Sequence, residues 1–201
     1  MSPQDKSTLS GGLFGLLIGD AVGRPYEFKS PTDIPNYEDI EIIPPAGYRC
    51  TYPQVPLGTW TDDGAQALAL LDSLIENNGL NLNHFAGCLC DWFKNGRYTP
   101  DGIVFDCGIQ TSDALGRIMC GTPILEAAGR DEYSNGNGAL MRVLPIALFE
   151  RTSIENLIQL AMDQCIPTHG HQRSAVVCAL YCVMAKQLID NQIYIGPDAA
   201  A

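Results

Sequence analysis

Residues 58–75 read GTWTDDGAQALALLDSLI, and this stretch decides the fold class. From Thr61 onward its apolar side chains recur three and four positions apart, at Leu68, Leu71, Leu74 and Ile75. That spacing puts them on one face of an α-helix, and the Asn78-Gly79 pair that follows is typical of a helix end. The stretch therefore predicts an amphipathic helix whose first turn carries two adjacent carboxylates, Asp62 and Asp63.

The same period recurs through most of the chain. It predicts helices from Pro3, with Ser2 as N-cap, to near Gly23, through Phe85 and Trp92 to Gly96, from about Asp106 to Met119, and after Pro123. It predicts three more: from Gly136 to Phe149, interrupted at Pro145; after a Thr152–Glu155 capping box; and from His171 to Asp190. The last of these is apolar almost all round and is expected to be buried. Residues 29–58 contain six prolines and no period, so we expect a long irregular segment there. No stretch alternates with period two and no linker divides the chain. The sequence predicts one compact, many-helix, all-α domain over residues 1–201.

Composition excludes several classes of protein. The chain is 46% hydrophobic and carries a formal charge of −11, which argues against disorder and against broad contact with nucleic acid or an anionic membrane. The longest apolar run, residues 175–185, is too short to span a bilayer. No leader-like segment begins the chain, so we expect a cytoplasmic protein, acting as a monomer, whose eight cysteines are reduced thiols.

Three short segments could carry chemistry. Thr61, Asp62 and Asp63 either cap a helix or offer hard oxygen ligands to Mg²⁺ or Mn²⁺. The glycine-rich loop Ser134-Asn135-Gly136-Asn137-Gly138 is either a turn or a place where backbone amides meet phosphate oxygens. His169, just before the longest helix, could be a donor, a base, a ligand or part of a cap. None of the three segments decides between its alternatives alone.

Five motifs occur in a fixed order between Gly19 and His169. They are Gly19-Asp20-Ala21-Val22-Gly23 followed by Glu27, Pro56-Leu57-Gly58-Thr59-Trp60-Thr61-Asp62-Asp63, Asp106-Cys107-Gly108-Ile109-Gln110-Thr111, Gly136-Asn137-Gly138 with Met141-Arg142, and Thr168-His169. Together they resemble the motifs of the ADP-ribosylglycohydrolase family, which includes the dinitrogenase-reductase-activating glycohydrolase and the ADP-ribosyl-arginine and ADP-ribosyl-serine hydrolases.

The resemblance implies an all-α fold whose cleft binds ADP-ribose and two divalent cations, Mg²⁺ or Mn²⁺. It implies that Thr61, Asp62 and Asp63 are metal ligands and that Glu27 acts beside the metals, with Glu27, Asp62 and Asp63 as the catalytic carboxylates. Substrate contacts are implied for Asp106, Ser134, Asn135, Gly136, Asn137, Gly138 and His169. Carboxylates suit the oxocarbenium-like state of glycosidic cleavage, and a metal can orient the ribose and supply a nucleophilic water.

The chain departs from the family pattern at three places. Gly64 stands where the family usually has Thr, and Gln66 where Met is common. Nothing after Asp190 matches the family's C-terminal D-x-D-T metal-binding segment. Three explanations compete: the chain is a fragment, it is a shortened relative that has lost catalysis, or a partner chain completes the site. We expect the domain to be C-terminally incomplete and its site to hold at most one metal ion well. Two functions follow from the resemblance. One is a metal-dependent hydrolase that frees ADP-ribose from a modified protein side chain or a small acceptor. The other is an inactive relative that binds ADP-ribose or a protein partner.

Overall fold

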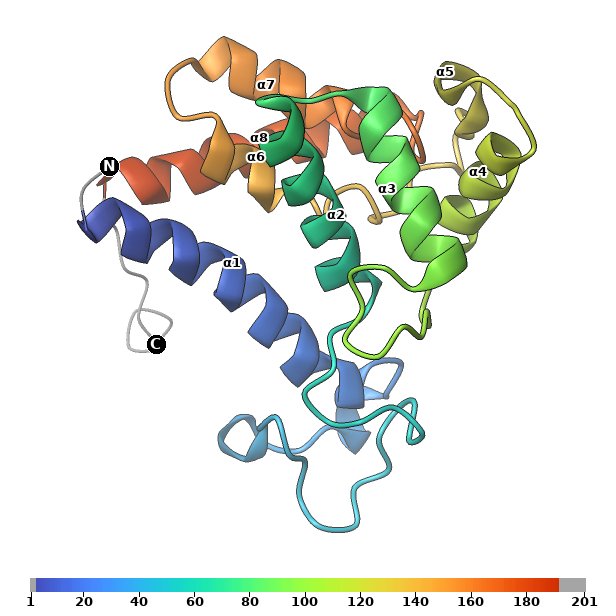
Figure 1. Cartoon of the computed structure of the whole chain (residues 1–201). Coiled ribbons are helices and arrows are strands. Elements are labelled where there is room, and N and C mark those ends of the chain that lie inside the picture. The colour runs from blue at the N-terminus through green and yellow to red at the C-terminus, as the bar shows by residue number, and fades with distance from the viewer. Residues whose placement is uncertain (1–2, 192–201) are drawn as a thin grey trace.

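The computed structural model describes residues 3–191, and within them it is all-helical, as predicted. Figure 1 shows the helices. They are α1 (Pro3–Gly23), α2 (Asp62–Asn77), α3 (Leu82–Asn95), α4 (Ile109–Met119), α5 (Ile124–Ala127), α6 (Leu144–Phe149), α7 (Ile154–Asp163) and α8 (Gln172–Asn191), with 3₁₀ turns at Arg24–Tyr26, Pro31–Asp33 and Tyr37–Asp39. The N-cap predicted at Ser2 and the C-terminal residues 192–201 lie outside the described part of the chain.

Helix α2 runs through the centre of the molecule and begins as the sequence predicts (Figure 1). The Thr61 hydroxyl accepts a hydrogen bond from the Asp63 N–H at 3.3 Å, which makes Thr61 the N-cap. Asp20, at the end of α1, accepts the N–H groups of Thr61 and Gly64 at 2.9 and 2.8 Å. Two motifs far apart in the sequence are thereby joined at one helix start.

The core lies where α2 packs against α3 and α6, and where α8 packs against α6 and α7. It is filled by apolar side chains that are fully buried or nearly so: Leu70, Leu74, Phe85, Leu89, Trp92, Leu115, Ile146, Leu157, Cys178 and Cys182. Helix α4 extends the packing outward from α3 and reaches the short α5. All eight cysteines are free thiols.

Four expectations about the helices need correction. Gly136–Phe149 is not one helix interrupted at Pro145: residues 137–142 form turns, and α6 begins at Leu144 with Pro145 in its first turn, where a missing N–H costs nothing. Helix α4 begins at Ile109, because Asp106 has a φ of 57°, which no α-helix accommodates. Helix α7 is capped by the Ser153 hydroxyl, which accepts the Asn156 N–H at 3.0 Å, whereas Thr152 bonds Glu150.

The expectation that the last helix is buried all round is also wrong for the residues described. Helix α8 buries one side, which includes Cys178, Ala179 and Cys182. The apolar side chains on its other sides are exposed, with Leu180 at 59% and Met184 at 67%. The helix packs on α6 and α7, and neither of them covers that face. Among residues 3–191 no helix is both long enough and apolar enough to cross a membrane.

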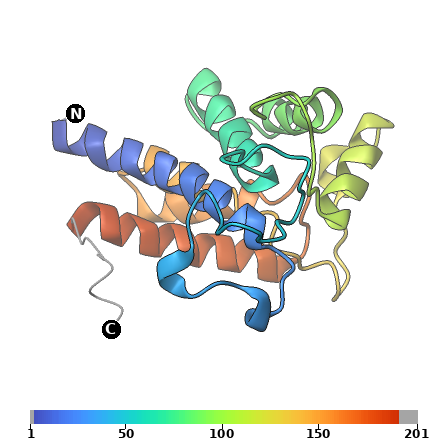
Figure 2. The ribbon, with the colours of Figure 1, turned by 90° about the horizontal axis from the view of Figure 1, so that it is seen from below.

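The irregular segment 29–58 is present as predicted and is fastened to the end of α1 (Figure 2). The fully buried Arg24 guanidinium donates to the carbonyl oxygens of Thr51, Tyr52 and Pro56 at 3.1–3.3 Å. The Tyr26 hydroxyl donates to the Glu41 carbonyl at 3.0 Å. These bonds hold a segment of little regular structure beside the start of α2.

Candidate functional site

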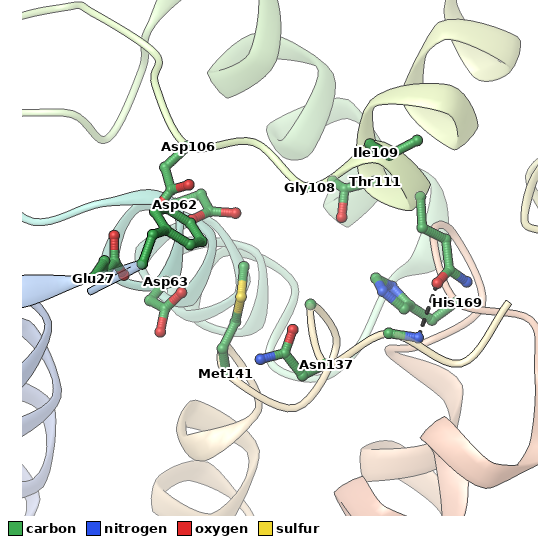
Figure 3. A pocket seen from close by; sticks show the side chains of 14 residues that line it. Glu27, Asp62, Asp63, Asp106, Gly108, Ile109, Thr111, Asn137, Met141 and His169 are labelled. Carbon is green, nitrogen blue, oxygen red and sulfur yellow. Dashed lines mark hydrogen bonds between the residues drawn. The ribbon is translucent and has the colours of Figure 1, made fainter. Parts of the chain in front are cut away.

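A pocket of about 420 Å³ opens at the N-terminal end of α2 (Figure 3). Its walls come from the chain after α1, from the starts of α2 and α4, from the glycine-rich loop and from the residues before α8. In Figure 3 the carboxylates of Glu27, Asp62, Asp63 and Asp106 gather at one end, and His169 lies at the other. The full lining is Glu27, Phe28, Asp62, Asp63, Asp106, Gly108, Ile109, Gln110, Thr111, Gly136, Asn137, Gly138, Met141 and His169.

The acidic end is built from three separate segments. Asp62 and Asp63 are the first two residues of α2, where the positive end of the helix dipole favours negative charge. Glu27 follows the 3₁₀ turn after α1. Asp106 is held by the Tyr52 hydroxyl, which donates to its carboxylate at 2.7 Å. Phe28, Tyr52 and Asp106 have φ values of 55–57°, an uncommon conformation for residues with side chains, which clusters at functional sites.

Gathering these carboxylates raises their pKa values. Burial raises the pKa of Glu27 to about 8, and the hydrogen bond with Asp106 and the charge of Asp106 add to this. Burial, followed by the charges of Asp63 and Asp106, raises the pKa of Asp62 to about 8. Burial and the charges of Asp20 and Asp106 raise the pKa of Asp63 to about 6. The pocket therefore gathers carboxyl groups whose ionisation is opposed by burial and by their mutual repulsion, and pKa perturbation of this kind is typical of functional sites.

The opposite wall is the glycine-rich loop, residues 134–138. Gly136, Asn137 and Gly138 line the pocket. A Cβ on Gly138 would lie 2.8 Å from the His169 ring and 3.1 Å from the Thr111 hydroxyl, so the backbone there passes too close to its neighbours for any side chain. The glycine at position 138 is therefore required by the packing of the loop against His169 and Thr111, whereas an approach of the loop backbone to a ligand stays a prediction.

His169 is a neutral hydrogen-bonding group. Its Nδ1 lies 2.9 Å from the Thr168 hydroxyl, which also accepts from the Arg142 guanidinium at 2.8 Å. Because Arg142 can only donate, the Thr168 proton is free to point at Nδ1, which favours the tautomer with the His169 proton on Nε2, next to Gly136 and Gly138. Burial, with the Arg142 charge, lowers the pKa of His169 to about 3, so the ring is uncharged at neutral pH.

Arg142 is the buried hub behind the site. Its guanidinium donates to the Gln66 side-chain oxygen at 2.8 Å and to both the side chain and the carbonyl of Gln164 at 2.9 Å, and it lies over the Phe85 ring. Gln66 in turn lies with its amide nitrogen 3.4 Å from the Asp62 carboxylate. The structure therefore explains why Gln66 can replace the Met that is common in the family. An apolar side chain would leave one Arg142 donor unpaired, whereas Gln66 links Arg142 to Asp62.

Gly64 also fits its surroundings. A Cβ there would lie 2.8–2.9 Å from the Trp60 ring and from Leu17 of α1. Trp60 is itself fixed, because its indole N–H donates to the Tyr98 carbonyl at 2.9 Å. A larger residue at position 64 would require α1 or Trp60 to move.

Most of the predicted site residues share the pocket, but three do not line it. Glu27, Asp62, Asp63, Asp106, Gly136, Asn137, Gly138 and His169 line it. Thr61 is buried as the N-cap of α2. The Ser134 hydroxyl donates to Asp131, and the Asn135 side chain donates to the Glu132 carbonyl, so both point elsewhere.

Three residues that support the pocket, Tyr52, Gln110 and Arg142, were not predicted to be functional, and Gln66 was noted only as a departure from the family pattern. Gln110 and Arg142 lie inside recognised motifs, and that was the only signal for them. Tyr52 lies in the irregular segment, where nothing in the sequence marks it.

The donor chemistry of the acidic end suits a hard divalent cation, because carboxylate oxygens are the ligands that Mg²⁺ and Mn²⁺ prefer. Within residues 3–191, Glu27, Asp62, Asp63 and Asp106 form no ion pair, and the buried Glu27 Oε2 has no hydrogen-bond partner. Over the same residues, no group of three or more His, Cys, Asp or Glu side chains is gathered as a ready-made metal site. The carboxylates are thus ligands of the kind that a divalent cation prefers, although they are not already gathered around one point in the part of the chain that the structure describes.

Comparison with known proteins agrees with the motifs. The family model for ADP-ribosylglycohydrolase matches residues 1–201. The ADP-ribosylarginine hydrolase Tri1 of Pseudomonas putida is 32% identical over 171 residues, which cover 85% of this chain and 43% of the relative. Tri1 of Serratia proteamaculans is 30% identical, covering 90% and 47%. The ADP-ribosyl-[dinitrogen reductase] glycohydrolase of Rhodospirillum rubrum is 29% identical, covering 90% and 58%.

The chain thus spans about half the length of the relatives it matches. The family match extends over every segment that builds the pocket, from Glu27 to His169. With its helical fold, its ordered motifs and this match, the chain belongs to the ADP-ribosylglycohydrolase family.

Proposed function

We propose that this chain forms the substrate pocket of a metal-dependent hydrolase that cleaves the glycosidic bond between ADP-ribose and a modified arginine side chain. The observation that carries the proposal is the shared pocket itself. Carboxylates from three separate segments face a glycine-rich loop and a neutral histidine across one cavity. Two of the relatives bear the name ADP-ribosylarginine hydrolase, which supports arginine as the acceptor.

The two ends of the pocket suit the two halves of such a substrate. Cleavage at the anomeric carbon of the ribose develops positive charge, which the Asp63 carboxylate can stabilise because its pKa of about 6 leaves it ionised at neutral pH. Glu27, with a pKa of about 8, is largely protonated at neutral pH and can give or take a proton there. At the far end, the loop amides and the His169 Nε2–H are donors suited to oxygens of the diphosphate and ribose.

Thr61, Asp62 and Asp63 would hold Mg²⁺ or Mn²⁺ at the start of α2. A bound divalent cation supplies a water of lowered pKa and an anchor for ribose hydroxyls. The protein's own part is to fix the two carboxylates: Asp20 holds the backbone of the helix start, and Gln66 lies against Asp62.

The proposal is tested by incubating the protein with Mn²⁺ and an ADP-ribosyl-arginine peptide, with an ADP-ribosyl-serine peptide in parallel, and measuring released ADP-ribose by chromatography. We expect release from the arginine peptide, its loss with EDTA, and a fall of about a hundredfold or more in the Asp62→Ala, Asp63→Ala double variant. Asp163→Ala is the matched control, because Asp163 lies on α7, which contributes nothing to the pocket.

Calorimetry with ADP-ribose separates the second candidate, a binder without catalysis. ADP-ribose binding that is unchanged by EDTA, with no turnover by the wild-type protein, would establish the binder and overturn the hydrolase. Turnover that the double variant retains would overturn the assignment of Asp62 and Asp63.

A further inference from the structure

The side chain of Gln110 joins the start of α4 to the glycine-rich loop. Its amide nitrogen donates to the Ser134 carbonyl at 2.9 Å, and its oxygen accepts the Gly136 N–H at 3.0 Å, the contact shown dashed in Figure 3. A carboxamide carries a donor and an acceptor side by side, as a peptide bond does. Gln110 therefore binds two backbone groups of the loop as a neighbouring strand would.

Local bonds to Asp131 and Glu132 hold Ser134 and Asn135, so the Gln110 contact matters most at Gly136. Ser134 ends a turn in which its N–H donates to the Asp131 carbonyl at 3.0 Å, but Asn135 and Gly136 belong to no helix. The glycines at 136 and 138 give the backbone after that turn more conformational freedom than other residues would. Beyond the Gln110 bonds, Gly136 is held through its carbonyl, which the Ser174 hydroxyl reaches at 3.5 Å. Gln110 itself is the second residue of α4, a helix packed against α3, so its position is fixed by the core.

The Gln110 contact also decides which loop amides are free. The Gly136 N–H points to Gln110 and is not available to a ligand. Within residues 3–191, the backbone N–H groups of Asn137 and Gly138 have no acceptor, and both residues line the pocket. Adjacent free amides of this kind are a typical binding place for phosphate oxygens.

We propose that Gln110 is a positioning residue: by holding Ser134 and Gly136, it presents the Asn137 and Gly138 amides to the diphosphate of ADP-ribose. This inference rests on the proposed function, because it takes ADP-ribose as the ligand. Gln110 also lines the pocket, but both of its side-chain hydrogen bonds go to the loop, so the inference assigns it to affinity and not to bond cleavage.

The test compares Gln110→Met, which keeps the length of the side chain and removes both hydrogen bonds, with the wild-type protein. We expect the Kd for ADP-ribose and the KM for the ADP-ribosylated peptide to rise about tenfold, with kcat changed less than about threefold. The matched control is Gln159→Met on α7, whose amide, among the described residues, bonds only Asp163 of its own helix. The control should change neither constant.

Amide hydrogen exchange supplies a readout that does not need activity. Gln110→Met should speed exchange at Gly136, whereas Gln110→Glu, which keeps an acceptor for that N–H, should leave Gly136 protected. Unchanged Kd and KM in Gln110→Met would overturn the inference while leaving the proposed hydrolase intact. If the wild-type protein neither binds nor cleaves ADP-ribose, the proposed function fails, and with it the role of Gln110 in presenting amides to ADP-ribose. If exchange at Gly136 is unchanged in Gln110→Met, the inference that Gln110 holds the loop is also overturned.

Discussion

Replacing Arg142 with lysine should destabilise the fold more than any other conservative change behind the pocket. The guanidinium makes four hydrogen bonds of 2.8–2.9 Å to Gln66, Gln164 and Thr168, and it is fully buried. A lysine ammonium keeps the charge but is a single point donor, which cannot span acceptors on three residues. At least two acceptors would be left unpaired in the core.

The magnitude follows from that count. A buried polar group left without a partner costs about 1–3 kcal/mol, so two of them cost roughly 3 kcal/mol in the free energy of unfolding. For a domain of this size, each kcal/mol corresponds to roughly 2–4 °C in the unfolding temperature. Arg142→Lys should therefore lower Tm by about 6–12 °C.

The assay is thermal unfolding followed by circular dichroism, confirmed by the urea midpoint with an unchanged m-value. Arg49→Lys, at an exposed position, is the control and should unfold within about 2 °C of the wild type. Because Thr168 and Gln66 contact His169 and Asp62, turnover should fall as well at a temperature where Arg142→Lys is still folded. If Arg142→Lys unfolds at the same temperature as the control, Arg142 is not the hub described above.

Three further changes test other parts of the structure. Asp62→Asn should raise Tm by a few degrees at neutral pH in EDTA and should abolish turnover. Because the pKa of the Asp62 carboxyl is raised, its ionisation destabilises the fold increasingly as pH rises from about 4 to 8. Equal Tm values for Asp62→Asn and the wild type at pH 8 would contradict this. Gly64→Ala should cost about 1–3 kcal/mol by urea unfolding, because its Cβ overlaps Trp60 and Leu17; a neutral result would show that they move freely. Glu150 accepts the Thr152 and Ser153 N–H groups, which lowers its pKa to about 2. Glu150→Gln should therefore be less stable than the wild type at pH 7, and this difference in stability should shrink as pH falls from 4.5 towards 2. A difference that does not change with pH would refute the assignment.

The helices near the start of α2 could be predicted because their signals are local. The N-cap at Thr61 and the stop at Asn78 depend on the residue types at a helix end, and the structure has both. Predictions failed where the signal came from tertiary packing. The exposed face of α8 carries the same apolar side chains as a buried one, and only the arrangement of neighbouring helices shows which side is covered.

The sequence by itself determined the helical class, the family and the identity of the carboxylates, because helix periodicity and ordered motifs are properties of residues near one another in the chain. Only the tertiary structure decided which groups support them. Gln66 against Arg142, Gln110 against Gly136 and Tyr52 against Asp106 are contacts between residues 76, 26 and 54 positions apart. Such pairs leave no pattern in a single sequence, since the burial and the hydrogen bonds that define them exist only once the helices have packed.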